Sequence, residues 1–160
     1  MGGTELEIRS IEPGDKPALA AAVDQSSDEA VYRRFLNPHG RLTAAELRYL
    51  TEVDHRDHEA LLAIDPVSHT SVGVARYVRD RDRHDTAEIA VAVLESWQGR
   101  GVGRALLHRL ADRARDEGIT RFTALMLSDN RPMRRLLADL GTTRLLSAGA
   151  GAVELAVDLV

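Results

Sequence analysis

The fold of this protein is decided by residues 91–107, "VAVLESWQGRGVGRALL". Glycines occupy positions 99, 101 and 103, directly before a pattern that predicts a helix running to about Gly118. Glycine reaches backbone angles that other residues avoid, so one interpretation is an ordinary tight turn. The other is a loop that cradles an anion, because the free N–H groups at a helix N-terminus carry partial positive charge.

Two well-known glycine loops do not match this stretch. The dinucleotide fingerprint requires a third glycine where this chain has Arg104. The ATP-type loop requires Gly-Lys followed by Ser or Thr, and the sequence contains no such triplet. What remains is a loop whose small residues let a phosphate approach the backbone while Arg100 and Arg104 add positive charge. A diphosphate is the ligand that suits it.

The strand before the loop, residues 87–93, has two different faces. Successive side chains of a strand point to opposite sides, so the larger apolar residues Ile89, Val91 and Val93 share one face. The other face carries Glu88 and two alanines, Ala90 and Ala92, which leave room for a packed helix or a slender ligand. Glu88 is either a solvated residue near the start of the strand or a functional carboxylate.

The remaining sequence predicts an α+β fold with a mixed sheet in a single unit, residues 1–160. Hairpins favour antiparallel pairs, and a helical crossover favours a parallel pair. Expected strands cover residues 5–11, 59–65, 71–78, 86–94, 120–127, 143–146 and 152–160, with a loop over 147–151. Five helices are expected. The first has Asp15 as its N-cap, the second centres on Val31, Phe35 and Leu36, and the third follows a Thr43–Glu46 capping box. The fourth follows the glycine loop, and the fifth covers residues 131–141.

Composition narrows the class of protein. The chain of 160 residues is 44% hydrophobic and 29% charged with a net charge of −4, which argues against a general nucleic-acid surface. It has no cysteine, so disulfides and thiolate metal sites are excluded. No apolar run approaches the roughly 20 residues of a membrane span, and we expect a cytoplasmic protein. His55 and His58 indicate a polar loop, and we expect no metal.

The glycine loop and the strand before it resemble those of the GCN5-related N-acetyltransferases (GNAT), whose acetyl-CoA-binding motif is Q/R-x-x-G-x-G/A after a strand. Gln98, Gly101 and Gly103 fall on its three fixed positions, and "SDNRPMRRLLADLG" (128–141) resembles the family's second motif. The resemblance implies a mostly antiparallel sheet of six to seven strands with four helices, in one acetyltransferase domain. Residues 28–38 and 46–63 are most similar to the acetyltransferase domain of bacterial protein lysine acetyltransferases.

The resemblance also implies roles for individual residues. Acetyl-CoA would be the co-substrate, with its pantetheine arm beside residues 91–93 and its pyrophosphate on the amides of residues 99–104. Glu88 would be the general base for the attacking amine, and a backbone N–H near Val93 would polarise the thioester. Asn130 would face the pantetheine or the sulfur, or would be a plain N-cap. The implied cofactor-binding residues are Val91, Ala92, Val93, Gln98, Gly99, Arg100, Gly101, Val102, Gly103, Arg104 and Asn130.

Two positions depart from the family pattern. Leu137 stands where many relatives have a tyrosine acting as general acid, and Thr142 stands where a phenylalanine is usual. Leu137 itself fits a core position of a helix. Three functions therefore stay open: acetylation of a protein lysine, acetylation of a small amine, and a catalytically silent module that binds acyl-CoA. The missing tyrosine favours the silent module, and Glu88 argues against it. The sequence is equally compatible with a monomer and with a homodimer.

Overall fold

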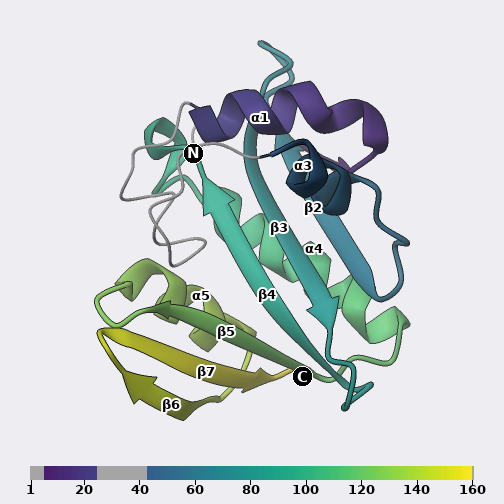
Figure 1. The fold of residues 1–160 in the computed structure, drawn as a ribbon. Helices are drawn as coiled ribbons and strands as arrows, with labels where there is room; N and C mark the ends of the chain where they lie inside the picture. Colours follow the sequence, from purple (N-terminus) through teal and green to yellow (C-terminus); the bar gives the residue numbers. More distant parts are fainter. Residues whose placement is uncertain (1–5, 25–42, 160) are drawn as a thin grey trace.

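A seven-stranded sheet organises the protein, in the order β1-β2-β3-β4-β5-β7-β6 (Figure 1). The computed structural model describes residues 6–24 and 43–159. All neighbouring strands are antiparallel except β4 and β5, which are parallel. The strands are β1 (Glu7–Ser10), β2 (His58–Ile64), β3 (Ser71–Arg79), β4 (Thr86–Val93), β5 (Arg121–Leu127), β6 (Thr143–Gly149) and β7 (Ala152–Asp158).

Helices cover both faces of the sheet. Within the described part the α-helices are α1 (Lys16–Asp24), α3 (Ala44–Thr51), α4 (Val102–Asp116) and α5 (Arg131–Leu140), with short 3-10 turns at Pro13–Asp15 and Glu95–Trp97. This arrangement confirms the predicted α+β class. The helix expected around Val31, Phe35 and Leu36 lies outside the described residues. No helix within residues 6–24 and 43–159 is both long and apolar enough to span a membrane.

Two apolar clusters hold the helices to the sheet. α4 and α5 pack on one face, where Leu106, Leu110 and Leu137 are fully buried. α1 and α3 pack on the other face over β2 and β3, against Leu62 and Val74. Figure 1 shows α1 and α3 in front of the sheet and α4 behind it. Leu137 is therefore a core residue, as its helical spacing predicted.

β4 and β5 separate soon after they pair. Their parallel register covers only Thr86–Glu88 with Arg121–Thr123, although β4 continues to Val93 and β5 to Leu127. Beyond Glu88 the two strands diverge, and Figure 1 shows the widening gap between their ends. The glycine loop follows β4 and the start of α5 follows β5, so both segments lie at the open end. This separation positions the functional site.

Local structure confirms one predicted motif and corrects two. The Thr43 hydroxyl accepts from Glu46 N (3.1 Å) and the Glu46 carboxylate accepts from Thr43 N (2.9 Å), which confirms the capping box. Asp15 is not an N-cap: its carboxylate lies in the 3-10 turn and accepts from Glu12 N at 2.7 Å. The loop expected over residues 147–151 is shorter, because β6 runs to Gly149. Ala150 and Gly151, both with positive φ (53° and 78°), then close a two-residue hairpin.

Candidate active site

A cleft of about 670 Å³ lies where β4 and β5 have separated. Its walls are the end of β4, the loop and first turn of α4, and the first turns of α5. All the predicted cofactor-binding residues except Arg100 line it. Segments far apart in sequence, residues 91–104 and 129–136, therefore meet around one cavity.

Backbone conformation explains the first two glycines of the loop. Gly99 and Gly101 have φ of 76° and 84°, in the left-handed region that side chains other than glycine rarely adopt. A Cβ at either position would meet no atom within 4 Å, so conformation rather than space requires glycine there. Gly101 is the N-cap of α4 and no side chain caps the helix. The first N–H groups of α4 are thus available to an anion in the cleft, which fits a phosphate group.

The third glycine, Gly103, has a different reason. A Cβ at this position would lie 3.2 Å from Leu136 Cδ1 and 3.7 Å from Val93 Cγ2. Gly103 therefore lets α4 approach α5 and β4 closely. We expected its small size to admit a phosphate, and what the structure shows at this position is close packing between elements.

Gln98 ties the loop to the strand before it. Its side-chain Nε2 donates to the carbonyl oxygen of Val93 at 3.1 Å. This bond spans the 3-10 turn between β4 and the glycines and fixes where the loop begins. Trp97 also lines the cleft, and the Arg100 guanidinium lies 4.9 Å from the centre of its ring. Arg100 is therefore stacked beside the cleft rather than placed in its wall.

The cationic side chains around the cleft differ from the expected set. Arg104 lines the cleft, but its Nε forms an ion pair with Asp139 of α5 at 3.0 Å. His108 Nε2 lies 2.7 Å from the same carboxylate, and this hydrogen bond, followed by the charge of Arg104, lowers the pKa of Asp139. Arg135 of α5 also lines the cleft and was not predicted.

Other lining residues were missed by sequence reasoning. Pro132, Met133 and Leu136 lie on one face of α5 and line the cleft, and Asp129, in the turn before α5, lines it as well. Helical periodicity, read together with the apolar pattern of α5, was the signal that could have identified the three helical residues.

Asn130 is placed both to cap α5 and to face a ligand in the cleft. Its Oδ1 accepts from Met133 N at 3.2 Å, so it is the N-cap of α5. The same residue lines the cleft. The cap fixes the side chain by its oxygen, so its amide nitrogen remains available as a donor.

Glu88 lies at the junction where β4 and β5 separate, but not in the cleft wall. It is the last β4 residue paired with β5, opposite Thr123, and solvent reaches its side chain. Partial burial is the main cause that raises the pKa of Glu88, and the negative charges of Glu154 and Asp80 raise it further. Within the described residues it has no ion pair. A carboxylate with a raised pKa beside a cleft is a candidate proton acceptor.

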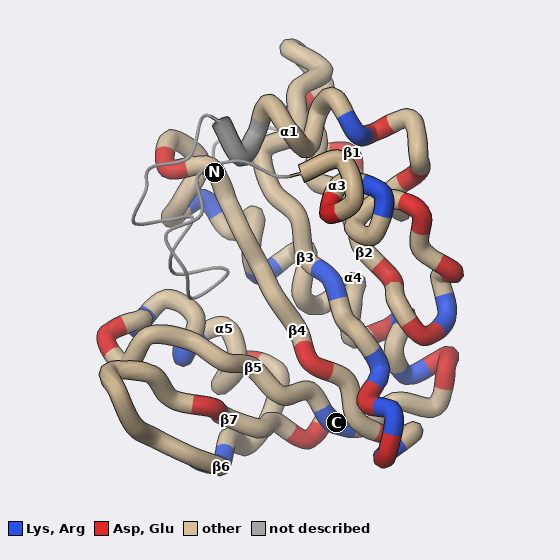
Figure 2. The backbone as a smooth tube through the Cα atoms, viewed as in Figure 1, with Lys and Arg blue, Asp and Glu red and all other residues tan. Residues whose placement is uncertain are grey.

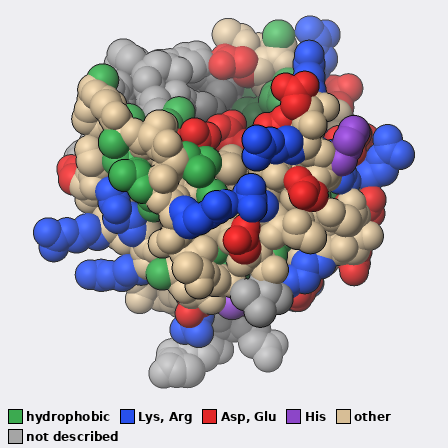
Figure 3. Space-filling view, turned by 90° about the horizontal axis from the view of Figure 1, so that it is seen from below, with side chains coloured by type: hydrophobic (Ala, Val, Ile, Leu, Met, Phe, Trp, Pro, Cys, Tyr) green, Lys and Arg blue, Asp and Glu red, His purple; other side chains and the backbone are tan. Residues whose placement is uncertain are grey.

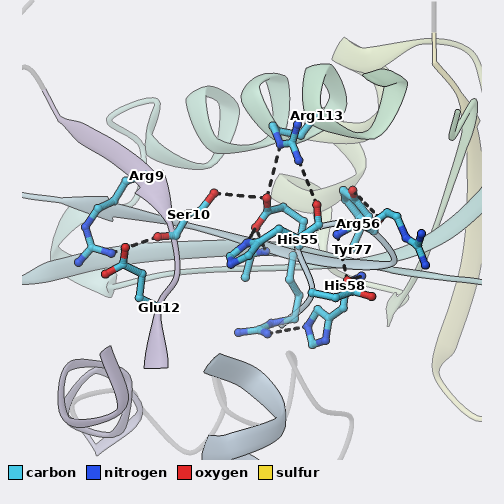
Figure 4. Close-up of polar contacts among 12 residues, drawn as sticks. Arg9, Ser10, Glu12, His55, Arg56, His58, Tyr77 and Arg113 are labelled. Atoms are coloured by element: carbon cyan, nitrogen blue, oxygen red, sulfur yellow. Dashed lines mark hydrogen bonds and ion pairs between the residues drawn. The ribbon is translucent and has the colours of Figure 1, made fainter. Parts of the chain in front are cut away.

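His55, in the loop before β2, and His58, the first residue of β2, face different directions (Figure 4). His55 Nδ1 lies 2.8 Å from Oε1 of Glu59, a carboxylate that is almost completely buried beneath α4. Arg113 of α4 donates to the same carboxylate at 3.4 Å and to His55 O at 3.0 Å. His58 lies on the opposite face, where burial lowers its pKa to about 4 and its Nε2 is 3.0 Å from Arg76. The two imidazole rings therefore do not point toward a common metal position. Within residues 6–24 and 43–159, no group of three or more His, Cys, Asp or Glu side chains is arranged to hold a metal ion.

The separated parallel pair, the uncapped helix start and the cleft between them fit the GNAT fold, and comparison with known proteins gives the same family. The sequence matches the acetyltransferase (GNAT) family over residues 23–142, and the chain belongs to this family. Its members are N-acetyltransferases that use acetyl-CoA.

Three individual relatives show which members of the family this chain is similar to. The chain is 35% identical over 139 residues to "Acetyltransferase Pat" of Mycolicibacterium smegmatis, covering 87% of this chain and 41% of that protein. It is 26% identical over 141 residues to "Acetyltransferase PA5475" of Pseudomonas aeruginosa, covering 87% and 75%. The crystal structure of the GNAT domain of S. lividans PAT superposes with a TM-score of 0.87 at 34% identity, covering 96% and 90%. The chain thus spans less than half of the Mycolicibacterium relative.

Proposed function

We propose that this chain transfers the acetyl group of acetyl-CoA directly to a primary amine, with Glu88 as the general base. The observation that carries the proposal is the place of Glu88 on β4, at the point where the strand leaves β5 and the cleft opens. The single sheet that runs through the described elements supports one acetyltransferase domain over residues 1–160.

The cleft offers complementary groups to the pyrophosphate and to the pantetheine arm of acetyl-CoA. The N–H groups of residues 99–104 suit the pyrophosphate, and Arg135 adds positive charge, while the charge of Arg104 is shared with Asp139. Beyond Glu88, the edge of β4 that faces β5 has no ladder partner within the described chain. A free strand edge pairs readily with an extended amide-containing chain, so residues 91–93 suit the pantetheine arm.

The reaction requires an unprotonated amine. Free lysine has a pKa of about 10.4, so an alkylamine arrives as an ammonium ion and must lose a proton before it attacks. Glu88 takes that proton, the nitrogen forms a bond to the thioester carbon, and the carbon–sulfur bond breaks. Of the two protons that the nitrogen loses overall, one passes through Glu88 to solvent and one ends on the sulfur of coenzyme A. The raised pKa makes Glu88 a stronger base than an ordinary glutamate.

The departing thiolate needs no tyrosine at position 137. Leu137 is fully buried in the core, away from the cleft, and the described cleft wall contains no tyrosine. A thiol has a pKa of about 8.5, so its anion is a stable leaving group. The silent acyl-CoA-binding module stays the second candidate, because Leu137 is the observation that favours it.

The test is amine-dependent release of free thiol from acetyl-CoA, measured for the wild type, Glu88→Gln and a matched control, Glu7→Gln. Glu7 is an exposed glutamate on the edge strand β1, far along the sheet from the cleft. The proposal predicts loss of turnover by about 100-fold or more only in Glu88→Gln, with coenzyme A affinity unchanged by calorimetry. Tight coenzyme A binding without thiol release from any amine in the wild type would identify the silent module instead.

A further inference from the structure

A second carboxylate, Glu154 of β7, lies on the same face of the sheet as Glu88. The register pairs Glu88 with Thr123, Thr123 with Ala156, and Leu125 with Glu154. Side chains alternate between faces, so Glu88, Thr123, Leu125 and Glu154 share one face. The residues beside them, such as Ile89 and Val153, are buried on the other face in the cluster with α4 and α5.

Glu154 lies on the side of Glu88 toward which the sheet opens. β4 and β5 are parallel, and Leu125 follows Thr123 in the direction in which the strands diverge. Glu154, opposite Leu125, is therefore across the opening from the second half of β4. Ideal sheet spacings place the Cα atoms of Glu88 and Glu154 ~12 Å apart, a span that two glutamate side chains and one ammonium group can fill. Figure 2 shows acidic positions on both strands, on either side of the gap.

Neither carboxylate has a counter-charge within the described part of the chain. The contrast is Asp158, also on β7, which binds Arg121 at 2.9 Å and lies 4.0 Å from Arg144. Glu154 has no such partner, and its negative charge raises the pKa of Glu88. Two partly buried like charges destabilise each other, and a bound cation relieves that repulsion.

The other charged groups on this face do not supply the cation. Arg76 of β3 donates from Nη1 to Leu50 O at 3.0 Å and lies 3.0 Å from His58, which directs it toward α3. Arg121 of β5 is held by Asp158. The charged groups on this face from the adjacent elements are Arg76 on β3, Asp80 after β3, Arg121 on β5, Glu154 and Asp158 on β7, and Arg144 on β6. Arg144 lies opposite Ala156, and its guanidinium is 4.0 Å from Asp158, with no ion pair to Glu154 among the described residues. In Figure 3, acidic and basic side chains are interspersed over much of the molecule's lower face.

Leu125 adds an apolar contact beside the acidic pair. Its side chain is 47% exposed and points to the same face as Glu154. An alkyl stem can pack on such a side chain while its charged end reaches a carboxylate. The combination matches an alkylammonium group and repels an amine that carries its own neighbouring carboxylate.

Resting on the proposed function, we propose that Glu154 selects the acceptor by charge, holding the ammonium group of an alkylamine opposite Glu88 before the proton is removed. The substrate class is an alkylammonium without an adjacent carboxylate, such as a lysine side chain within a peptide. Glu154 positions the acceptor, and Glu88 carries the proton.

The test compares wild type, Glu154→Gln and Glu154→Asp with two acceptors. Nα-acetyl-lysine amide carries one positive charge, and hydroxylamine is uncharged near neutral pH. Glu154→Gln is expected to raise KM for the lysine amide about tenfold, with kcat within about twofold and hydroxylamine kinetics unchanged. The acid limb of its kcat/KM profile moves to lower pH, since loss of the neighbouring charge lowers the pKa of Glu88. Glu154→Asp restores part of the KM.

A second measurement needs no turnover. Calorimetric titration of the lysine amide into the complex with coenzyme A, which cannot transfer an acetyl group, is expected to show about tenfold weaker binding in Glu154→Gln. Equal lysine-amide affinity in wild type and Glu154→Gln overturns the inference, whether or not the wild type is active. Equal losses with both acceptors, together with a lowered Tm, also overturn it by identifying a structural role. Absence of thiol release from every amine contradicts the proposed function and leaves the binding result to decide the role of Glu154.

Discussion

Replacement of Gly101 by alanine tests the link between backbone conformation and phosphate binding. Gly101 has a φ of 84°, and a methyl group added at its Cα would have no atom within 4 Å, so Gly101→Ala introduces conformational strain without a clash. For an L-residue the left-handed region costs about 1–2 kcal/mol. At about 2–4 °C per kcal/mol for a chain of this size, Tm is expected to fall by about 2–8 °C.

The same change is expected to weaken coenzyme A binding more than it weakens the fold. The strain is relieved when the peptide before α4 rotates, and the first helical N–H then no longer points into the cleft. A hydrogen bond to a charged group is worth about 1.5–3 kcal/mol, so losing one predicts a Kd for coenzyme A about 10–100 times higher. Pantetheine, which lacks the diphosphate, is expected to bind Gly101→Ala and wild type equally.

Calorimetry with both ligands and thermal denaturation are the assays, and Gly14→Ala is the matched control. Gly14 also has open space at its Cβ, but it lies outside the left-handed region. Its replacement should change neither Tm nor Kd appreciably. An unchanged coenzyme A affinity in Gly101→Ala, or an equal loss for pantetheine, would refute the assignment of the helix start to the diphosphate.

Individual contacts elsewhere in the chain support three more predictions. The pKa of Glu88 is raised in the folded state, so its charge opposes folding increasingly as pH rises through that raised pKa. Glu88→Gln should therefore have a Tm at pH 7 no lower than wild type, with the difference shrinking toward pH 4, by calorimetric scans at each pH. Glu59→Gln removes the charge of a buried carboxylate that Arg113 binds. Urea denaturation should show that the free energy of unfolding falls by about 2 kcal/mol, with coenzyme A affinity unchanged. A variant as stable as the wild type would contradict the role of that pair. Gln98→Ala removes the bond to Val93 O and should raise the coenzyme A Kd about fivefold by calorimetry, while an unaltered Kd would mean the loop is held by other contacts.

Local chemistry determined much of this protein from its sequence alone. The Thr43–Glu46 capping box, the end of β4 and the uncapped start of α4 after Gly101 depend on residues a few positions apart. Their hydrogen bonds and backbone angles are short-range, so a linear pattern is sufficient to predict them. The core position of Leu137 followed from helical periodicity for the same reason.

Tertiary structure decided the surroundings of the cleft. The pairing of Arg104 with Asp139 and the contact of Gly103 with Leu136 depend on how α4 meets α5, and Glu154 reaches the face of Glu88 through β5. None of these relations has a fixed sequence spacing, because a one-residue shift in strand register would turn Glu154 to the other face. The sequence by itself thus determined the helix start that suits a phosphate, while the separation of β4 from β5 and the meeting of distant side chains required the folded sheet.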